Sequence, residues 1–106
     1  MVILSQVEDF ANFIVENSGG SLQVVVDGNK KFIFKAYEPM NYLVERFGIK
    51  LLQLGKDEAL PNRYFYIARS NKKEELLKDE NVLIEAYKTH GRFTILLVQD
   101  NKMHNE

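Results

Sequence analysis

Residues 62–73 read NRYFYIARSNKK, and the alternation of aromatic and aliphatic residues within them is typical of a β-strand. Alternate side chains of a strand project to opposite faces, so Phe65 and Ile67 are expected on one face and Tyr64 and Tyr66 on the other. Two arginines and two lysines accompany the tyrosines, and no acidic residue lies among the twelve. The stretch therefore predicts a sheet strand, and it raises the question of whether the tyrosine face binds nucleic acid.

Four further segments have the β-branched and aromatic composition of strands. Residues 22–26 and 92–99 are apolar on both faces, which predicts central strands. Residues 27–30, DGNK, are expected to form a hairpin turn, because glycine and asparagine tolerate positive φ. The second strand of that hairpin is expected at residues 31–37, and a short strand is expected at residues 49–54.

Two helices have clear beginnings and ends in the sequence. Ser5 starts a capping box with the glutamate three residues later, which predicts a helix over residues 5–17. Pro39 suits the first turn of a helix, and Gly48 suits the position just after its end, which predicts a helix over residues 39–47. The apolar residues expected to face the core from these helices are Val7, Phe10, Ala11, Phe13 and Ile14, and Met40, Leu43, Val44 and Phe47.

A third helical region is expected from residue 71 to His90, ended by Gly91. Glu80 interrupts its apolar face and Asp79 suits a helix cap, so a break into two short helices is expected there. His90 would then lie at a helix C-terminus, where a group that can carry positive charge is favoured.

These elements predict the order α-β-β-α-β-β-α-β. The corresponding fold is an α/β (α+β) protein with a single mixed sheet of about five strands and three helices packed on it. If residues 1–4 form a leading strand, the alternative is a ferredoxin-like start. The length predicts one globular domain over residues 1–106, with residues 100–106 as a frayed tail.

The composition restricts the classes of function. The formal net charge is −1, so no overall field attracts nucleic acid or an anionic membrane. There is no cysteine, which excludes disulfides and thiolate metal sites and suits a reducing compartment. No secretory signal and no apolar run of about 20 residues is present. We expect a cytoplasmic protein that makes no membrane contact.

No catalytic, metal or cofactor site is predicted, and an enzyme is the less favoured class. The two histidines, His90 and His104, lack the spacing of a helical metal site. One enzymatic alternative is a divergent Mg²⁺-dependent nuclease, with acids and a lysine meeting at neighbouring strand ends. Its candidates are Glu8 or Glu16, Asp27 and Lys35, although Ile33 occupies the position of the signature acid before the lysine.

The basic and aromatic stretch supports a nucleic-acid-binding alternative, because exposed rings stack on bases while cations follow phosphates. Its residues are Arg63, Tyr64, Tyr66, Arg69, Lys72 and Lys73, with Lys30, Lys31 and Lys35 from a second segment without acids. The opposing interpretation is structural, since tyrosine is a favoured strand residue and packs well beneath a helix.

The favoured prediction is a non-catalytic protein-interaction or regulatory module. Twelve aromatic residues and no catalytic grouping suit a small domain that acts by presenting a surface. If residues 31–37 or 49–54 form an edge strand, that strand could pair with its copy in a homodimer. The partner is therefore expected to be a second copy of the chain or another protein.

Overall fold

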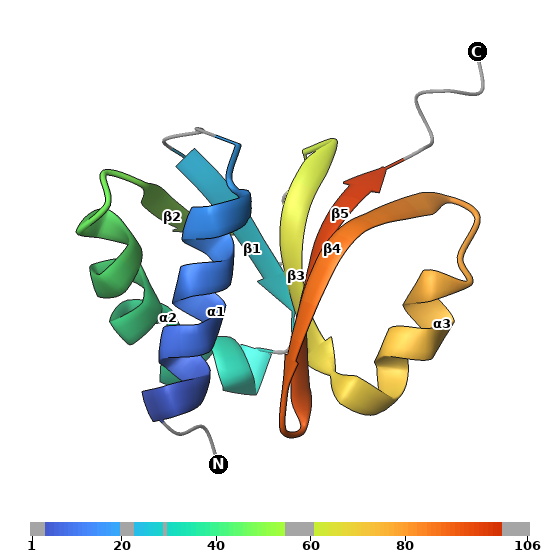
Figure 1. Ribbon diagram of the computed structural model, residues 1–106, viewed down its shortest axis with the longest axis horizontal. Helices are drawn as coiled ribbons and strands as arrows, with labels where there is room; N and C mark the ends of the chain where they lie inside the picture. Colours follow the sequence, from blue (N-terminus) through green and yellow to red (C-terminus); the bar gives the residue numbers. More distant parts are fainter. Residues whose placement is uncertain (1–3, 20–22, 29, 55–60, 101–106) are drawn as a thin grey trace.

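The computed structural model describes residues 4–19, 23–28, 30–54 and 61–100, with the backbone alone described at residues 30–34 and 100. It contains one mixed five-stranded sheet and three helices, so the predicted fold class is confirmed (Figure 1). The elements are α1 (Leu4–Asn17), β1 (Gln23–Gly28), α2 (Lys30–Glu45), β2 (Lys50–Gln53), β3 (Arg63–Arg69), a 3₁₀ turn η1 (Ser70–Lys72), α3 (Lys73–Leu77), β4 (Val82–His90) and β5 (Phe93–Asp100).

The strands lie in the order β2-β1-β3-β5-β4. Strand β1 is parallel to both of its neighbours, β2 and β3, whereas β5 is antiparallel to β3 and β4. The sheet thus has a parallel half and an antiparallel half, joined at β3. The predicted central positions of residues 22–26 and 92–99 are confirmed in substance, because β1 and β5 each have a strand on both sides.

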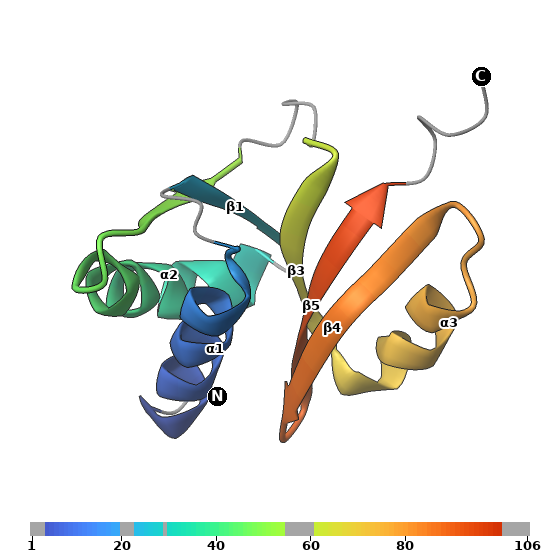
Figure 2. The same cartoon turned by 45° about the horizontal axis from the view of Figure 1, so that its top comes forward.

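The two faces of this sheet are covered differently. Helices α1 and α2 lie on one face, which we call the covered face, and α3 lies on the other, which we call the open face (Figure 2). The main core fills the space between the covered face and the two long helices. It includes Phe65 and Ile67 from β3, together with residues of β1, β2 and β5.

Helix α1 confirms the predicted apolar stripe, since Val7, Phe10, Ala11, Phe13 and Ile14 are all buried. It begins at Leu4, so Ser5 lies inside the first turn and not at the cap. The ferredoxin-like alternative needs a leading strand, but Leu4 is already helical and residues 1–3 lie outside the described part of the chain.

Residues 31–37 are helical, so the predicted hairpin strand is wrong there. The reason is the spacing of Ala36, Met40 and Val44, which lie four residues apart and are each fully buried. These three make one continuous helical stripe, and its burial outweighs the strand propensity of the aromatic residues before it. The expected turn at residues 27–30 is accordingly the connection between β1 and α2, with residue 29 outside the described part.

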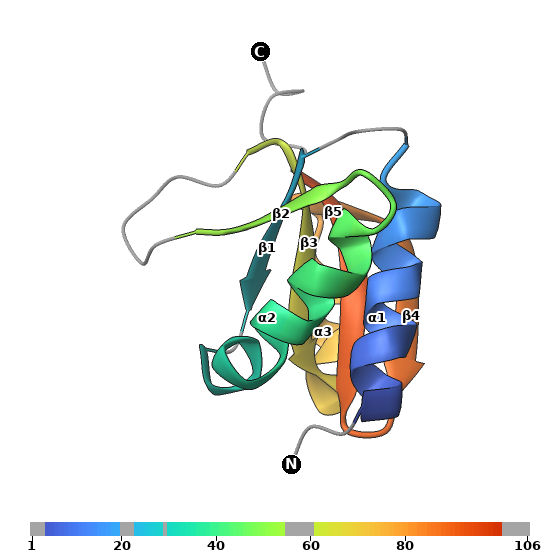
Figure 3. The same cartoon turned by 90° about the vertical axis from the view of Figure 1, so that its left-hand side faces the viewer.

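Pro39 lies in the interior of α2 and not in its first turn as expected. A proline has no backbone N–H to bond the carbonyl one turn earlier, and interior prolines bend helices. The ribbon of α2 changes direction between its first turns and its later turns in Figure 3. Proline therefore marks a bend in one long helix, where the sequence suggested a beginning.

The end of α2 agrees with the prediction. Gly48 has a φ of 78°, its N–H donates to the carbonyl of Glu45, and the N–H of Ile49 donates to that of Val44. This pair of bonds is the Schellman motif, in which glycine adopts the left-handed conformation. Phe47, predicted to be buried, lies in this turn and is 60% exposed.

The predicted helical region at residues 71–90 is mostly wrong. Only η1 and the five residues of α3 are helical, and residues 82–90 form strand β4. The chain does break near Asp79, whose carboxylate accepts the backbone N–H of Asn81. Gly91, with a φ of 63°, does not end a helix but opens the two-residue loop between β4 and β5, as glycine does in type II′ hairpins.

Within the described residues, no helix combines the length and the apolar character needed to cross a bilayer.

Candidate functional site on the open face

Strand register gathers the open-face side chains into rows that cross the sheet. Val25 of β1 pairs with Leu52 of β2, and Tyr64 of β3 pairs with Val98 of β5. Val26 pairs with Phe65, so Val25 lies beside Tyr64 one position earlier. The first row is therefore Leu52, Val25, Tyr64, Val98 and Ile84, and the second is Asp27, Tyr66, Leu96 and Tyr87.

Helix α3 covers only the antiparallel half of these rows. Its Leu76 packs against a small second core in which Leu96 and Val98 are buried. In Figure 2, α3 lies next to β4 and β5 on the side away from α1 and α2. The core beneath α3 also includes Ala68 at the end of β3, but no described helix lies over β2 and β1 on this face, and Val25, Leu52 and Tyr64 stay half-buried. The helices of the described residues thus leave β2 and β1 uncovered on one side.

A crevice lies at the carboxyl ends of β1 and β3. Strand β1 leads into α2 on the covered face, whereas β3 leads into η1 and α3 on the open face. When the connections of adjacent parallel strands leave toward opposite faces, they open a crevice where ligands commonly bind. Here the crevice encloses about 540 Å³ and is lined by Gly28, Tyr66, Ile67, Ala68, Arg69, Lys72, Glu75 and Leu76.

The close approach of β1 to β3 at this crevice depends on glycine. A β-carbon on Gly28 would lie only 2.3 Å from the carbonyl oxygen of Ile67. No other residue fits there without moving one of the two strands. The backbone itself therefore forms one wall of the crevice.

Tyr66 lies at the same place, half-buried beside Asp27 of β1. Burial raises the pKa of the Tyr66 hydroxyl, and the negative charge of Asp27 raises it further. The hydroxyl is therefore protonated at neutral pH and available as a hydrogen-bond donor. Asp27, expected in a turn, is in fact a strand residue of β1.

The structure separates the basic residues that the sequence grouped together. Arg63 projects to the covered face, where its Nε lies 2.8 Å from Glu85 and its Nη2 lies 3.5 Å from the carbonyl oxygen of Asn17. It ties β3 to β4 and to the end of α1. The Nζ of Lys73 lies over the ring of Tyr87, 4.8 Å from its centroid. Both cations already have structural partners.

The second basic segment belongs to α2. Lys35 is exposed on that helix, and the side chains of Lys30 and Lys31 lie outside the described part. Because the segment is not a strand, the nuclease alternative loses the neighbouring strand that would carry Lys35. Of the seven predicted nucleic-acid contacts whose side chains are described, Tyr66, Arg69 and Lys72 line the crevice, and Tyr64 lies in the row beside it.

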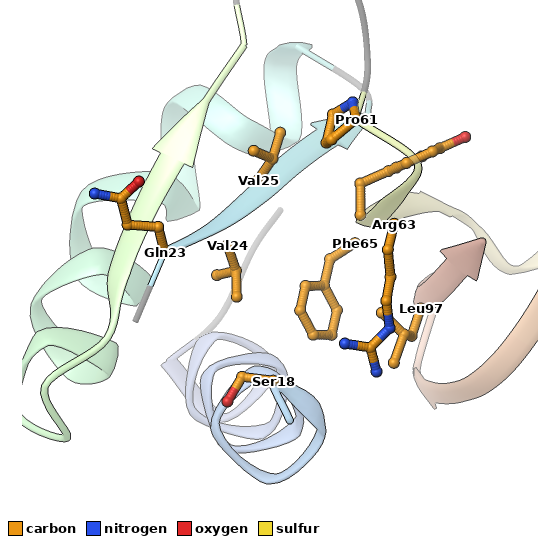
Figure 4. A pocket seen from close by; sticks show the side chains of 9 residues that line it. Ser18, Gln23, Val24, Val25, Pro61, Arg63, Phe65 and Leu97 are labelled. Atoms are coloured by element: carbon orange, nitrogen blue, oxygen red, sulfur yellow. The ribbon is translucent and has the colours of Figure 1, made fainter. Parts of the chain in front are cut away.

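A second cavity of about 240 Å³ lies where β1 and β3 diverge, at their amino ends (Figure 4). Figure 4 shows the side chain of Arg63 running beside Phe65 and Leu97 toward the end of α1 that carries Ser18. Ser18 donates its hydroxyl to the carbonyl of Val15, and Arg63 is bound to Glu85. The polar groups of this cavity are engaged within the chain, so it is the weaker candidate.

One ionisable pair was not foreseen from the sequence. The Nδ1 of His90 lies 2.5 Å from a carboxylate oxygen of Asp9, and the side-chain amide of Gln6 donates to the His90 carbonyl. His90 ends β4 and not a helix, so these contacts attach the β4–β5 hairpin to α1. Among residues 4–19, 23–28, 30–54 and 61–100, no three histidine or carboxylate side chains gather as a metal site.

The chain matches no protein-family model, and neither the curated proteins nor the solved structures contain a significantly similar one.

Proposed function

We propose that the protein is a non-catalytic interaction module that forms a homodimer through the uncovered half of its open face. The observation that carries this proposal is the uneven covering of the parallel strands β2, β1 and β3. Parallel sheets occur almost only with both faces covered, because their strands are apolar on both sides. Here the covered face has two long helices, and no helix of the described residues lies over β2 and β1 on the open face.

The side chains of this region suit contact with a second protein surface. Leu52, Val25 and Tyr64 form an adjacent apolar row, and each is half-buried in the single chain. Tyrosine is enriched at interfaces because it combines a large apolar ring with a polar tip. A second copy that apposes the same row would supply the missing layer. A reducing compartment such as the cytoplasm suits this cysteine-free module.

Sedimentation equilibrium tests the proposal. We expect the wild-type chain to dimerise and Leu52→Glu to raise the dimer dissociation constant about tenfold or more, because it buries a charge in the apolar row. The matched control is Leu83→Glu, which makes the same substitution on the other edge strand, β4, at a side chain that is 48% exposed. Circular dichroism of both variants verifies that the fold is intact.

Two outcomes would contradict the proposal. A wild-type chain that stays monomeric at millimolar concentration excludes the homodimer. A dimer that Leu83→Glu disrupts and Leu52→Glu leaves intact would place the interface on β4.

Binding of single-stranded nucleic acid is a second proposal, supported by the position of Tyr64 and Tyr66 side by side on the open face of β3. Arg69 lies at the end of the same strand. Binding of an oligonucleotide that weakens steeply with salt, and that Tyr64→Ala removes while the fold stays intact, would support it. Oligonucleotide binding that Tyr64→Ala leaves unchanged would count against it.

A further inference from the structure

We propose that the crevice at the carboxyl ends of β1 and β3 binds a small phosphorylated ligand of mononucleotide size, with its phosphate on Arg69 and Lys72 and a planar ring against Tyr66. This site lies beyond the interface proposed above, because it is formed by different residues at the end of the strands.

The position of the crevice follows from the connections of the sheet. The chain leaves β1 toward the covered face and leaves β3 toward the open face, so the two connections diverge at the carboxyl ends of these strands. Such switch points bind ligands in many open sheets for this geometric reason. Gly28 allows the backbone of β1 to approach that of β3 closely, because a β-carbon there would lie only 2.3 Å from the carbonyl oxygen of Ile67.

The size and lining of the crevice suit a ligand with an apolar and a charged part. About 540 Å³ lies within the range of small-molecule sites. Ala68 and Leu76 form apolar walls and Tyr66 adds a half-buried ring, whereas the side chain of Ile67 belongs to the core of the covered face. Planar ring systems stack on tyrosine regardless of their exact hydrogen-bonding pattern.

The charges indicate how the ligand is oriented. Arg69 and Lys72 are exposed, and neither forms an ion pair with a described residue. Among the described residues of the lining, Glu75 is acidic, and Asp27 lies beside Tyr66. A phosphate is therefore repelled from the Tyr66 end by Asp27 and attracted to the Arg69 end. The uncharged ring is left for the tyrosine.

Isothermal titration calorimetry at low salt with three probes tests this arrangement: adenosine 5′-monophosphate, adenosine and inorganic phosphate. We expect the monophosphate to bind with a dissociation constant of about 1 mM or below, and each half to bind about tenfold more weakly. Arg69→Gln and Lys72→Gln should each raise the dissociation constant of the monophosphate about tenfold, since each removes one charge-assisted contact. Lys73→Gln is the matched control, because the adjacent Lys73 lies over Tyr87 and does not line the crevice.

The ring contact has its own pair of variants. Tyr66→Leu should lower the affinity for the monophosphate and leave the affinity for inorganic phosphate unchanged. Tyr66→Phe should preserve both affinities because it keeps the ring. Thermal unfolding of each variant establishes that it is folded.

Three results would overturn the proposal. The first is no binding of the monophosphate at about 10 mM, a concentration at which a site with a millimolar dissociation constant would be occupied. The others are equal affinity for the monophosphate and inorganic phosphate, and an affinity for the monophosphate that neither Arg69→Gln nor Lys72→Gln changes. The titration repeated on Leu52→Glu separates this site from the dimer, because the crevice needs no second chain.

Discussion

Neighbouring residues of β3 point to opposite faces of the sheet, and helices of very different length cover those two faces. Phe65 and Ile67 are almost completely buried beneath α1 and α2, whereas the neighbouring Tyr64 and Tyr66 are half-buried on the open face. The helices over the first pair have 14 and 16 residues, and α3 over the second face has five. The covered face therefore holds the larger buried core, and the tyrosines of the open face keep part of their surface exposed.

The largest expected difference between the faces concerns stability. Phe65→Ala should lower the free energy of unfolding by about 3–5 kcal/mol, because it leaves a cavity in the main core. The substitution also removes the edge-to-face contact between the rings of Phe65 and Phe13, whose centroids lie 5.9 Å apart. Tyr64→Ala should cost only about 1 kcal/mol. Urea unfolding measures both, and equal losses would show that the open face is covered in solution.

A substitution at the junction between β1 and β3 should lower the free energy of unfolding by a smaller amount. Gly28→Ala should lower the free energy of unfolding by about 1–3 kcal/mol, because the new methyl group meets the carbonyl oxygen of Ile67 and forces the strands apart. Asp27→Ala, one residue earlier on the open face, is the control and should cost less. If Gly28→Ala is neutral by urea unfolding, the two backbones are not held so close.

A row of hydrogen-bonded hydroxyl groups on the open face should contribute less to stability. The hydroxyl of Thr94 is fully buried and lies 3.1 Å from that of Ser70 and 2.9 Å from that of Thr89. Thr94→Val should lower the free energy of unfolding by about 1–2 kcal/mol, because it leaves hydrogen-bonding groups unpaired. Thr89→Val, at an exposed residue, should cost less in the same urea experiment. The reverse order would mean that water replaces the Thr94 hydroxyl.

The smallest expected effect is on pH dependence, with one tyrosine from each face. Burial raises the pKa of Tyr37, which packs against the covered core, and that of Tyr66 on the open face, each from a usual value of 10.0. The folded state therefore holds these protons more tightly than the unfolded state. Their contribution to stability is complete below pH 10.0 and is lost as the pH rises through the folded-state pKa.

Unfolding free energies at about pH 9 and pH 11 measure this loss, on either side of the ordinary tyrosine pKa. Tyr66→Phe should lose less stability than the wild type over that interval. If the wild type and Tyr66→Phe lose the same free energy of unfolding between the two pH values, Tyr66 is better hydrated than its position in the crevice implies.

Much of the fold was predictable from local patterns. The apolar stripe of α1, the alternation of β3 and the glycine that ends α2 each depend on residues close together in the chain. The misassigned segments, 31–37 and 82–90, have local patterns that suit either state. The first is helical because Ala36 continues a stripe with Met40 and Val44. The second is a strand because it pairs with β5 across the Gly91 loop.

The candidate site was predictable only in part. Alternation correctly placed Tyr64 and Tyr66 on one face, but it also sends Arg63 to the other, where Glu85 binds it. Glu85 lies at an irregularity between Ile84 and Ala86 of β4, which no local pattern revealed. The crevice was not foreseen, because its walls come from β1, β3 and α3 together.

By itself, the sequence determined which side chains of each strand share a face, since that depends only on the two-residue repeat of an extended backbone. It also determined that one mixed sheet with three helices would form. Only the tertiary structure decided which face of β3 the long helices cover and where the crevice opens. Those features depend on the direction in which the chain leaves each strand and on partners distant in sequence, and local periodicity contains no information about either.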